Sequence, residues 1–224
     1  MLKDIEVIFI DLFYTLIVPQ YSLDGNEYDV VGLSLEAWEQ VAEDERLYDD
    51  RATGKVTDPK QIIMEMINKA KLDLPADVID DLLNIREERF KEAITHVDEH
   101  IIEVLKEIKA AGIKLCLISN ADIIDVMYWK ESPLCHLFDD VVFSYEVGCV
   151  KPDKEIYDIA LLKMKTTSDK CLFIGDGGSD ELKGAKQLGI KTVMTKQFIE
   201  RDELKKSEHV DYVIDEFSDL YHIL

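Results

Sequence analysis

The sequence predicts an α/β protein whose three-layer parallel sheet is interrupted near its start by an all-helical segment. From residue 98 onward, short apolar runs rich in β-branched residues alternate with helical patterns, which is typical of a parallel sheet. Between residues 17 and 95 the apolar residues recur only at helical spacing. The chain is therefore expected to form a core from residues 1–16 and 96–224, with a helical insertion at residues 17–95.

The first predicted strand, Val-Ile-Phe-Ile at residues 7–10, runs directly into Asp11. An apolar run this short fits a strand that is buried on both faces of a sheet. Asp11 then lies at the carboxyl end of the strand, where open α/β sheets bind ligands. A lone aspartate can also simply end a strand, so its meaning depends on the residues at the ends of the other strands.

Three helices are predicted in the insertion, and each has a recognisable start. Ser34 is a candidate N-cap for a helix that continues to about residue 48. Thr57 or Asp58 can cap a second helix with Pro59 in its first turn, and Pro75 opens a third.

Strands and helices alternate in the second half of the chain. The predicted helices are near residues 101–108, 122–129, 156–164 and 181–188. The predicted strands are at residues 7–10, 113–120, 141–144, 171–174, 191–195 and 212–214.

The composition excludes several classes of partner. Acidic residues outnumber basic ones by 47 to 26, which gives a net charge of −21 and disfavours nucleic acids and membrane surfaces. No apolar run approaches the length of a membrane span. The four cysteines contain no C-x-x-C pair, which favours free thiols in a reducing compartment over a zinc site. We expect a cytoplasmic monomer or homodimer that acts on a small molecule.

Polar residues follow several predicted strands, and a parallel sheet brings such strand ends to one edge. Besides Asp11, these residues are Ser119, Asn120, Lys151, Asp176 and Asp180. Carboxylates that converge there repel one another unless a cation lies between them, and oxygen ligands favour Mg²⁺. Lys151 supplies a positive charge that suits a phosphate. Asp11 could then act as a nucleophile and form an aspartyl-phosphate that water cleaves.

Each of these residues has a simpler explanation when it is considered alone. Residues 175–178 could form an ordinary turn, Ser179 or Asp180 could only cap the next helix, and Lys151 could be a solvated loop residue. Their joint occurrence in this order favours the functional interpretation.

The combination resembles the motifs of the haloacid dehalogenase-like (HAD) superfamily over nearly the whole chain. The first motif, D-x-x-x-T-L, matches residues 11–16, and the second, an apolar strand ending in Ser-Asn, matches residues 117–120. The third matches residues 146–157, and the fourth matches residues 174–180. The resemblance implies a Rossmann-like core with a helical cap inserted after the first strand, and a phosphatase acting on a small phosphorylated metabolite.

The resemblance also implies a role for each matched residue, with Mg²⁺ as the cofactor. The expected catalytic residues are Asp11 as nucleophile, with Ser119 and Lys151 holding the phosphoryl group. The expected substrate-binding residues are Thr15, Ser119, Asn120 and Lys151. The expected metal ligands are Asp11, the backbone carbonyl of Phe13, Asp176 and Asp180.

One position departs from the superfamily pattern. Phosphatases that resemble this chain usually carry a second Asp two residues after the nucleophile as general acid and base, whereas here that residue is Phe13. General acid–base catalysis contributes about 10²–10⁴-fold, so Phe13 favours leaving groups that need little protonation. His96 or His100 could replace the missing group, although a hinge or surface role fits both.

Two other functions remain open at this stage. The 2-haloacid dehalogenases of the superfamily also have an aromatic residue at the position of Phe13, but they usually lack an acid at the position of Asp176. A catalytically weak protein that binds a phosphate ligand is the third hypothesis. Substrate choice is expected to depend on the cap, where Trp38, Arg46, Tyr48 and Arg51 are candidates, although the place of Trp38 on an apolar stripe favours a role in the cap core. Hinges are expected near residues 17–20 and 95–99.

Overall fold

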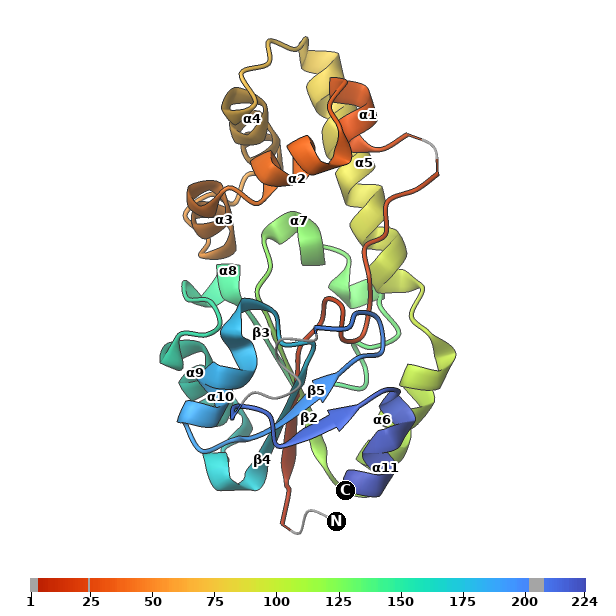
Figure 1. Cartoon of the computed structure of the whole chain (residues 1–224), viewed down its shortest axis with the longest axis vertical. Coiled ribbons are helices and arrows are strands. Elements are labelled where there is room, and N and C mark those ends of the chain that lie inside the picture. The colour runs from red at the N-terminus through yellow and green to blue at the C-terminus, as the bar shows by residue number, and fades with distance from the viewer. Residues whose placement is uncertain (1–3, 24, 202–207) are drawn as a thin grey trace.

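The computed structural model, which describes residues 4–23, 25–201 and 208–224, contains a six-stranded sheet in the order β3-β2-β1-β4-β5-β6 (Figure 1). All five pairs of neighbouring strands are parallel. The strands are β1 (Val7–Ile10), β2 (Lys114–Ser119), β3 (Asp140–Phe143), β4 (Cys171–Gly175), β5 (Lys191–Thr195) and β6 (Tyr212–Ile214). The predicted α/β class and parallel sheet are confirmed, and β1, which ends just before Asp11, lies between β2 and β4.

Helices cover both faces of this sheet and give it three layers. On one face, α6 (Glu99–Ala110) and α11 (Leu220–Ile223) pack in one hydrophobic cluster with Ile8 and Ile10. On the other face, α9 (Lys154–Met164) and α10 (Glu181–Gln187) pack in a second cluster with Val7 and Phe9. Because β1 alternates its side chains between the two clusters, all four of its residues are buried.

The insertion between β1 and α6 is helical, as predicted, and forms the upper part of the molecule in Figure 1. Its helices are α1 (Glu27–Val31), α2 (Leu35–Ala42), α3 (Glu45–Ala52), α4 (Pro59–Lys69) and α5 (Ala76–Thr95). Trp38 and Leu82 are fully buried in a cluster that this segment shares with Ile124 of α7 (Ile123–Val126) in the core. The predicted division into two domains at residues 16/17 and 95/96 stays a prediction.

The helix starts follow the sequence signals closely. The Ser34 side chain accepts a hydrogen bond from the amide of Ala37, and Asp58 caps α4 with Pro59 at its first position. The predicted helix from Ser34 to about residue 48 is instead two helices, α2 and α3. The chain breaks there because Asp44 leaves the helical conformation and its carboxylate caps α3 at the amide of Leu47.

Short elements account for the other differences between the prediction and the structure. Helix α1 lies where a loop was expected, and its Asn26 and Asp29 form a reciprocal capping box. Helix α8 (Ser144–Val147) follows β3 directly. Helices this short carry too little periodicity to be read from sequence. Single 3₁₀ turns lie at Trp129–Glu131, Ser168–Lys170, Gly178–Asp180 and Phe217–Asp219.

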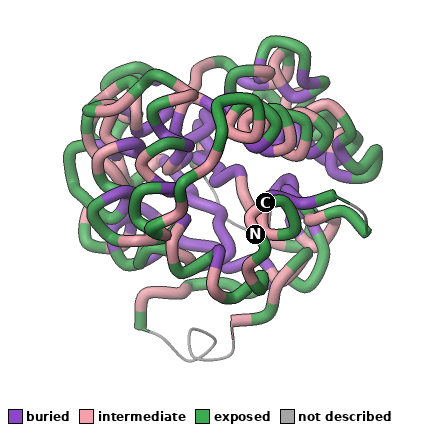
Figure 2. Tube along the Cα trace, turned by 90° about the horizontal axis from the view of Figure 1, so that it is seen from above, coloured by how far each residue is buried: buried purple, intermediate pink, exposed green. Residues whose placement is uncertain are grey.

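Burial follows the layers of the fold. The buried stretches lie toward the inside of the molecule, and the exposed ones lie along its outer side (Figure 2). All four cysteines lie in the described ranges and are free. Across those ranges, none of the helices combines the length and the apolar character that crossing a membrane requires.

The C-terminal end of α3 contacts the core closely at Gly54. Gly54 has a φ of +71°, and a Cβ at this position would lie 2.1 Å from the backbone carbonyl oxygen of Tyr145 in α8. The backbone of the insertion can approach α8 this closely only because residue 54 has no side chain.

We therefore expect Gly54→Ala to lower the free energy of unfolding more than Gly32→Ala. Gly32 also has a positive φ, +68°, but within the described chain a Cβ there would meet nothing closer than 4 Å. Both variants carry the positive-φ cost of about 1–2 kcal/mol, so their difference reports the contact with α8. Urea unfolding of the two variants measures this difference, and equal losses would contradict the close contact.

Candidate active site

Asp11 is held in place by the loop that follows β1. Its amide donates to the carbonyl oxygen of Ile174 in β4 at 2.9 Å, which continues the sheet ladder by one residue. The loop then turns tightly, with Tyr14 in the left-handed region at a φ of +57°. The turn brings the Thr15 hydroxyl within 2.9 Å of Asp11 Oδ2, to which it donates a hydrogen bond. Thr15 therefore lies beside Asp11, and its predicted substrate-binding role stays a prediction.

Lys151 lies against Asp11 because Asn120 fixes the backbone around it. The Asn120 side chain accepts from the Lys151 amide at 2.7 Å and donates to the Lys151 carbonyl at 3.0 Å. The buried Lys151 ammonium forms an ion pair with Asp11 Oδ1, and it donates to Glu181 Oε2 at 2.6 Å. Residues from the first three motifs therefore converge at the edge of the sheet.

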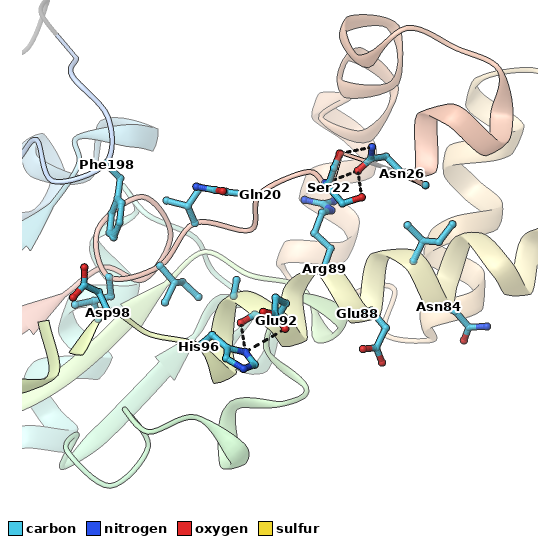
Figure 3. Close-up of a pocket in the computed structure, with 16 residues that line it drawn as sticks. Gln20, Ser22, Asn26, Asn84, Glu88, Arg89, Glu92, His96, Asp98 and Phe198 are labelled. Atoms are coloured by element: carbon cyan, nitrogen blue, oxygen red, sulfur yellow. Dashed lines mark hydrogen bonds and ion pairs between the residues drawn. The ribbon is translucent and has the colours of Figure 1, made fainter. Parts of the chain in front are cut away.

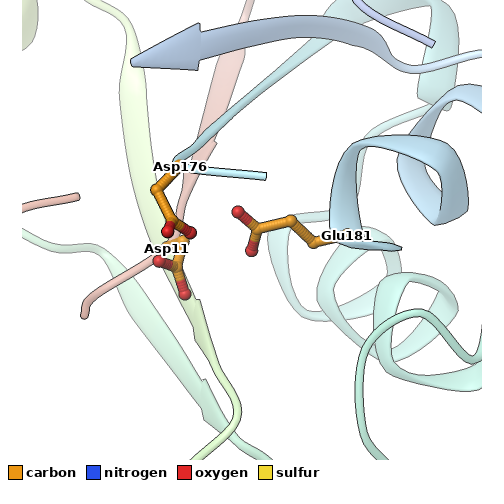
Figure 4. A group of neighbouring side chains, drawn as sticks. All are labelled: Asp11, Asp176 and Glu181. Atoms are coloured by element: carbon orange, nitrogen blue, oxygen red, sulfur yellow. The ribbon is translucent and has the colours of Figure 1, made fainter. Parts of the chain in front are cut away.

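Three buried carboxylates form a cluster at this edge: Asp11, Asp176 and Glu181 (Figure 4). One ligand oxygen from each lies within 4.8 Å of the others. The arrangement supplies only oxygen atoms, as Mg²⁺ prefers, and a cation between them would relieve their mutual repulsion.

Glu181, rather than the predicted Asp180, joins Asp11 and Asp176 in this cluster. Ser179 and Asp180 both have a positive φ, 52° and 51°, so α10 begins only at Glu181. The exposed carboxylate of Asp180 pairs with Lys183 at 3.2 Å. Glu181 lies one residue later on the first turn of the helix, and its Oε1 accepts from the Gly177 amide at 3.0 Å.

Burial and neighbouring charges shift the pKa values of the groups in this cluster. Burial raises the pKa of Asp11, and the nearby Asp176 raises it further, while Lys151 acts in the opposite direction. Burial, and next the charge on Asp11, raises the pKa of Glu181 to about 8. Burial alone would lower the pKa of Lys151, but the charges on Asp11 and Glu181 raise it, so Lys151 stays an ammonium.

Asp176 is further tied to a residue that the sequence motifs did not point to. Arg201, in the connection after β5, binds Asp176 Oδ2 through Nε at 2.7 Å and Nη2 at 2.6 Å. Asp176 Oδ1 accepts from the Gly178 amide at 3.0 Å. The buried Tyr157 hydroxyl donates to the Glu181 carbonyl oxygen at 2.7 Å and so fixes the start of α10.

The cluster opens into a cavity of about 770 Å³ between the core and the insertion. Asp11, Asn120, Lys151, Asp176 and Glu181 line it from the core. The insertion contributes side chains of three helices, including Tyr48, Arg51 and Arg86.

Two buried arginines of the insertion bind two buried aspartates of the core beside this cavity. Arg51 Nε lies 3.0 Å from Asp122 Oδ2, and Arg86 Nη2 lies 3.2 Å from the same oxygen. Arg86 Nη2 also lies 2.7 Å from Asp125 Oδ1. Asp122 and Asp125 begin α7 just after Asn120, so this network connects the insertion to the loop that positions Lys151.

Phe13 turns its ring toward the insertion. The ring packs edge-to-face against Phe90 of α5, with centroids 5.6 Å apart. The predicted role of its backbone carbonyl as a metal ligand stays a prediction.

Ser119 is fully buried at the end of β2, and its hydroxyl lies 3.4 Å from the Asn120 carbonyl oxygen. Ser119 is not among the described residues that line the cavity.

A second cavity of about 770 Å³ lies where the chain enters and leaves the insertion. Ile17 and Gln20 line it from the entering segment, and His96 lines it from the leaving one (Figure 3). His96 pairs with Glu92 at 3.2 Å, and His100 is exposed at the start of α6. Within the described chain, neither histidine lines the cavity that contains Asp11.

Three features of the site were not predicted from the sequence: Glu181, Arg201 and the arginine–aspartate network. Glu181 is adjacent to the predicted Asp180, and its acidic side chain at the first helical position was the available signal. Arg201 stands outside all four motifs, and within the network Arg86 bonds to residues 36 and 39 positions away. Contacts over such separations leave no local pattern in a single sequence.

Comparison with known proteins gives relatives that are phosphatases by name. Glyceraldehyde 3-phosphate phosphatase of Methanocaldococcus jannaschii is 31% identical over 137 residues, which are 60% of this chain and 59% of that protein. The corresponding protein of Methanothermobacter thermautotrophicus is 31% identical over 54% of this chain and 55% of its own length. Pyrophosphatase PpaX of Bacillus velezensis is 29% identical over 70% of this chain and 71% of that protein. The chain thus spans somewhat more than half the length of the first two relatives.

Solved structures share the fold over nearly the whole chain. A dehalogenase structure superposes with a TM-score of 0.71 at 17% identity, covering 100% of this chain and 99% of that one. An enzyme of Bacteroides thetaiotaomicron in complex with magnesium and inorganic phosphate superposes with a TM-score of 0.67 at 16% identity, covering 90% of this chain and 100% of that one. The model of the haloacid dehalogenase-like hydrolases matches residues 23–195. The chain belongs to the haloacid dehalogenase-like hydrolase family, as its motifs predicted.

Proposed function

We propose that the protein is a Mg²⁺-dependent phosphatase that transfers the phosphoryl group of a small metabolite to Asp11. The observation that carries this proposal is the buried cluster in which Asp11 pairs with Lys151 and approaches Asp176 and Glu181. Relatives named as phosphatases support the same reaction class. We further propose a cytoplasmic enzyme, monomeric or homodimeric.

The charges around the cluster fit a divalent cation. When ionised, the three carboxylates of Asp11, Asp176 and Glu181 exceed the two cations Lys151 and Arg201 by one negative charge. We propose Asp11, Asp176 and Glu181 as the side-chain ligands, with the Phe13 carbonyl as a backbone ligand. Mg²⁺ bound there would offset the negative charge of the phosphoryl oxygens.

The proposed reaction proceeds in two steps at phosphorus. In the first, a carboxylate oxygen of Asp11 bonds to phosphorus while the bond to the leaving oxygen breaks. The Thr15 hydroxyl, which bonds to Oδ2, keeps the carboxylate in a fixed orientation. Lys151 offsets the charge on Asp11 and on the incoming phosphoryl group. Water then attacks phosphorus and releases phosphate from Asp11. Ser119 and Asn120 remain proposed phosphoryl-site residues on the basis of their motif.

The buried acid cluster also argues for the phosphatase over the alternatives. A 2-haloacid dehalogenase would have to bind an anionic substrate and release halide beside Asp11, Asp176 and Glu181 without a metal. The converging carboxylates would repel both anions. A purely binding role is less well supported because the Asp11–Lys151 pair and its supporting hydrogen bonds are complete.

Replacing the nucleophile tests the reaction. We expect Asp11→Asn to lower turnover of p-nitrophenyl phosphate by at least about 10³-fold, because the first covalent step is lost. A colorimetric assay with Mg²⁺, and again with a chelator, measures both the dependence on Asp11 and the dependence on the metal. Circular dichroism checks that the variant is folded. Undiminished turnover in Asp11→Asn would contradict the proposal.

Variants of the neighbouring residues Asp180 and Glu181 test which of the two binds the metal. We expect Glu181→Gln to weaken Mg²⁺ binding roughly 10-fold or more, because it removes one charged oxygen ligand from the cluster. The matched variant Asp180→Asn should change the affinity by less than about 2-fold, because Asp180 forms only an exposed ion pair. Isothermal titration calorimetry with Mg²⁺ measures both affinities. A larger loss of Mg²⁺ affinity in Asp180→Asn than in Glu181→Gln would identify Asp180, not Glu181, as the ligand.

A further inference from the structure

Helix α3 lies over the active-site cavity and is anchored to the core at two points. Arg51 is buried and reaches the buried Asp122 at 3.0 Å. One residue beyond the C-cap of the helix, Gly54 lies against the backbone of Tyr145. A side chain on the same face of α3 is therefore held toward the core.

Tyr48 occupies that face. It precedes Arg51 by three residues, which places the two side chains on neighbouring positions of one helical surface. The Arg51 guanidinium lies over the Tyr48 ring, 5.1 Å from its centroid, so the ring is covered on one side. Tyr48 lines the cavity together with Asp11 and Lys151.

The phenol of Tyr48 carries a proton under working conditions. Its burial, and next the charge on Glu43, raises the pKa of Tyr48 to about 12, although Lys151 acts in the opposite direction. Its hydroxyl is therefore a hydrogen-bond donor throughout the neutral pH range. Phe13, by contrast, lines the same cavity with a ring that has no proton to give.

We propose that the Tyr48 hydroxyl protonates the leaving oxygen of the phosphate ester and so supplies, from the insertion, the acid that residue 13 lacks. This inference rests on the proposed phosphatase function. As the bond from Asp11 to phosphorus forms, the bond to the leaving oxygen breaks and its electron pair remains on that oxygen. The oxygen takes the proton of Tyr48. In the second step the attacking water bonds to phosphorus, the bond between phosphorus and the Asp11 oxygen breaks, and the water gives a proton back to the phenolate.

A leaving-group series tests this role with Tyr48→Phe. The substrates are aryl phosphates whose leaving groups rise in pKa from p-nitrophenyl to phenyl, followed by an alkyl phosphate. We expect Tyr48→Phe to keep kcat/KM for p-nitrophenyl phosphate within about 3-fold of the unmodified enzyme, because this leaving group needs little protonation. For the poorest leaving groups the loss should reach about 10²-fold.

Tyr14→Phe is the matched control, because Tyr14 also brings a hydroxyl to the cavity but lies 39% exposed on the β1 loop. In Tyr14→Phe, kcat/KM should fall with rising leaving-group pKa as steeply as it does in the unmodified enzyme. Thermal unfolding of both variants verifies that they are folded. An equal loss on every substrate in Tyr48→Phe, or a steeper dependence in Tyr14→Phe instead, would overturn the inference.

The series also separates this inference from the proposed function. Turnover can depend on Asp11 while kcat/KM of Tyr48→Phe varies with leaving-group pKa as in the unmodified enzyme. In that case Tyr48 is not the acid, and the phosphatase proposal stands. If the unmodified enzyme hydrolyses none of these esters, both proposals fall.

Discussion

The pairing of one buried ammonium with a group of buried carboxylates is the interaction on which the rest of the site depends. Desolvating Lys151, Asp11 and Glu181 costs free energy that only close pairing offsets. The fold meets this requirement by bringing together side chains that are 140 and 30 residues apart. Strand β1 delivers Asp11, the Asn120 amide fixes Lys151, and the first turn of α10 presents Glu181.

The same constraint explains the arrangement of the insertion. Arg51 and Arg86 are buried against Asp122 and Asp125, so a second set of ion pairs joins the insertion to the start of α7. Burial, and next the charge on Asp122, raises the pKa of Asp125 to about 6. Because Asp122, the N-cap of α7, lies two residues after Asn120, the position of the insertion is physically connected to the position of Lys151. A hinge at residues 17–20 and 95–99 stays a prediction, and the second cavity lies between those segments.

The sequence predicted the sheet and the helix starts because both depend on local patterns. The apolar runs at residues 7–10 and 171–174 are short and buried, and Ser34 and Asp58 cap helices as their residue types suggest. The motifs also predicted that Asp11, Asn120 and Lys151 would lie at one edge of the sheet, where the structure brings them together, and their catalytic roles stay predictions. The choice between Asp180 and Glu181 was not predictable, because it depends on two left-handed residues in the preceding turn. The partner of Asp176 could not be foreseen either, since Arg201 reaches it from a separate connection.

If Asp11 carries the phosphoryl group during turnover, as proposed, the acyl phosphate on this residue can be trapped chemically. Enzyme with Mg²⁺ and p-nitrophenyl phosphate is quenched in acid within a single turnover, treated with hydride and digested. Mass spectrometry then locates the residue whose acyl phosphate was reduced. We expect conversion of Asp11 to homoserine, with Asp176 and Glu181 unchanged. Release of phosphate with an unmodified Asp11, or a reduced residue elsewhere, would contradict it.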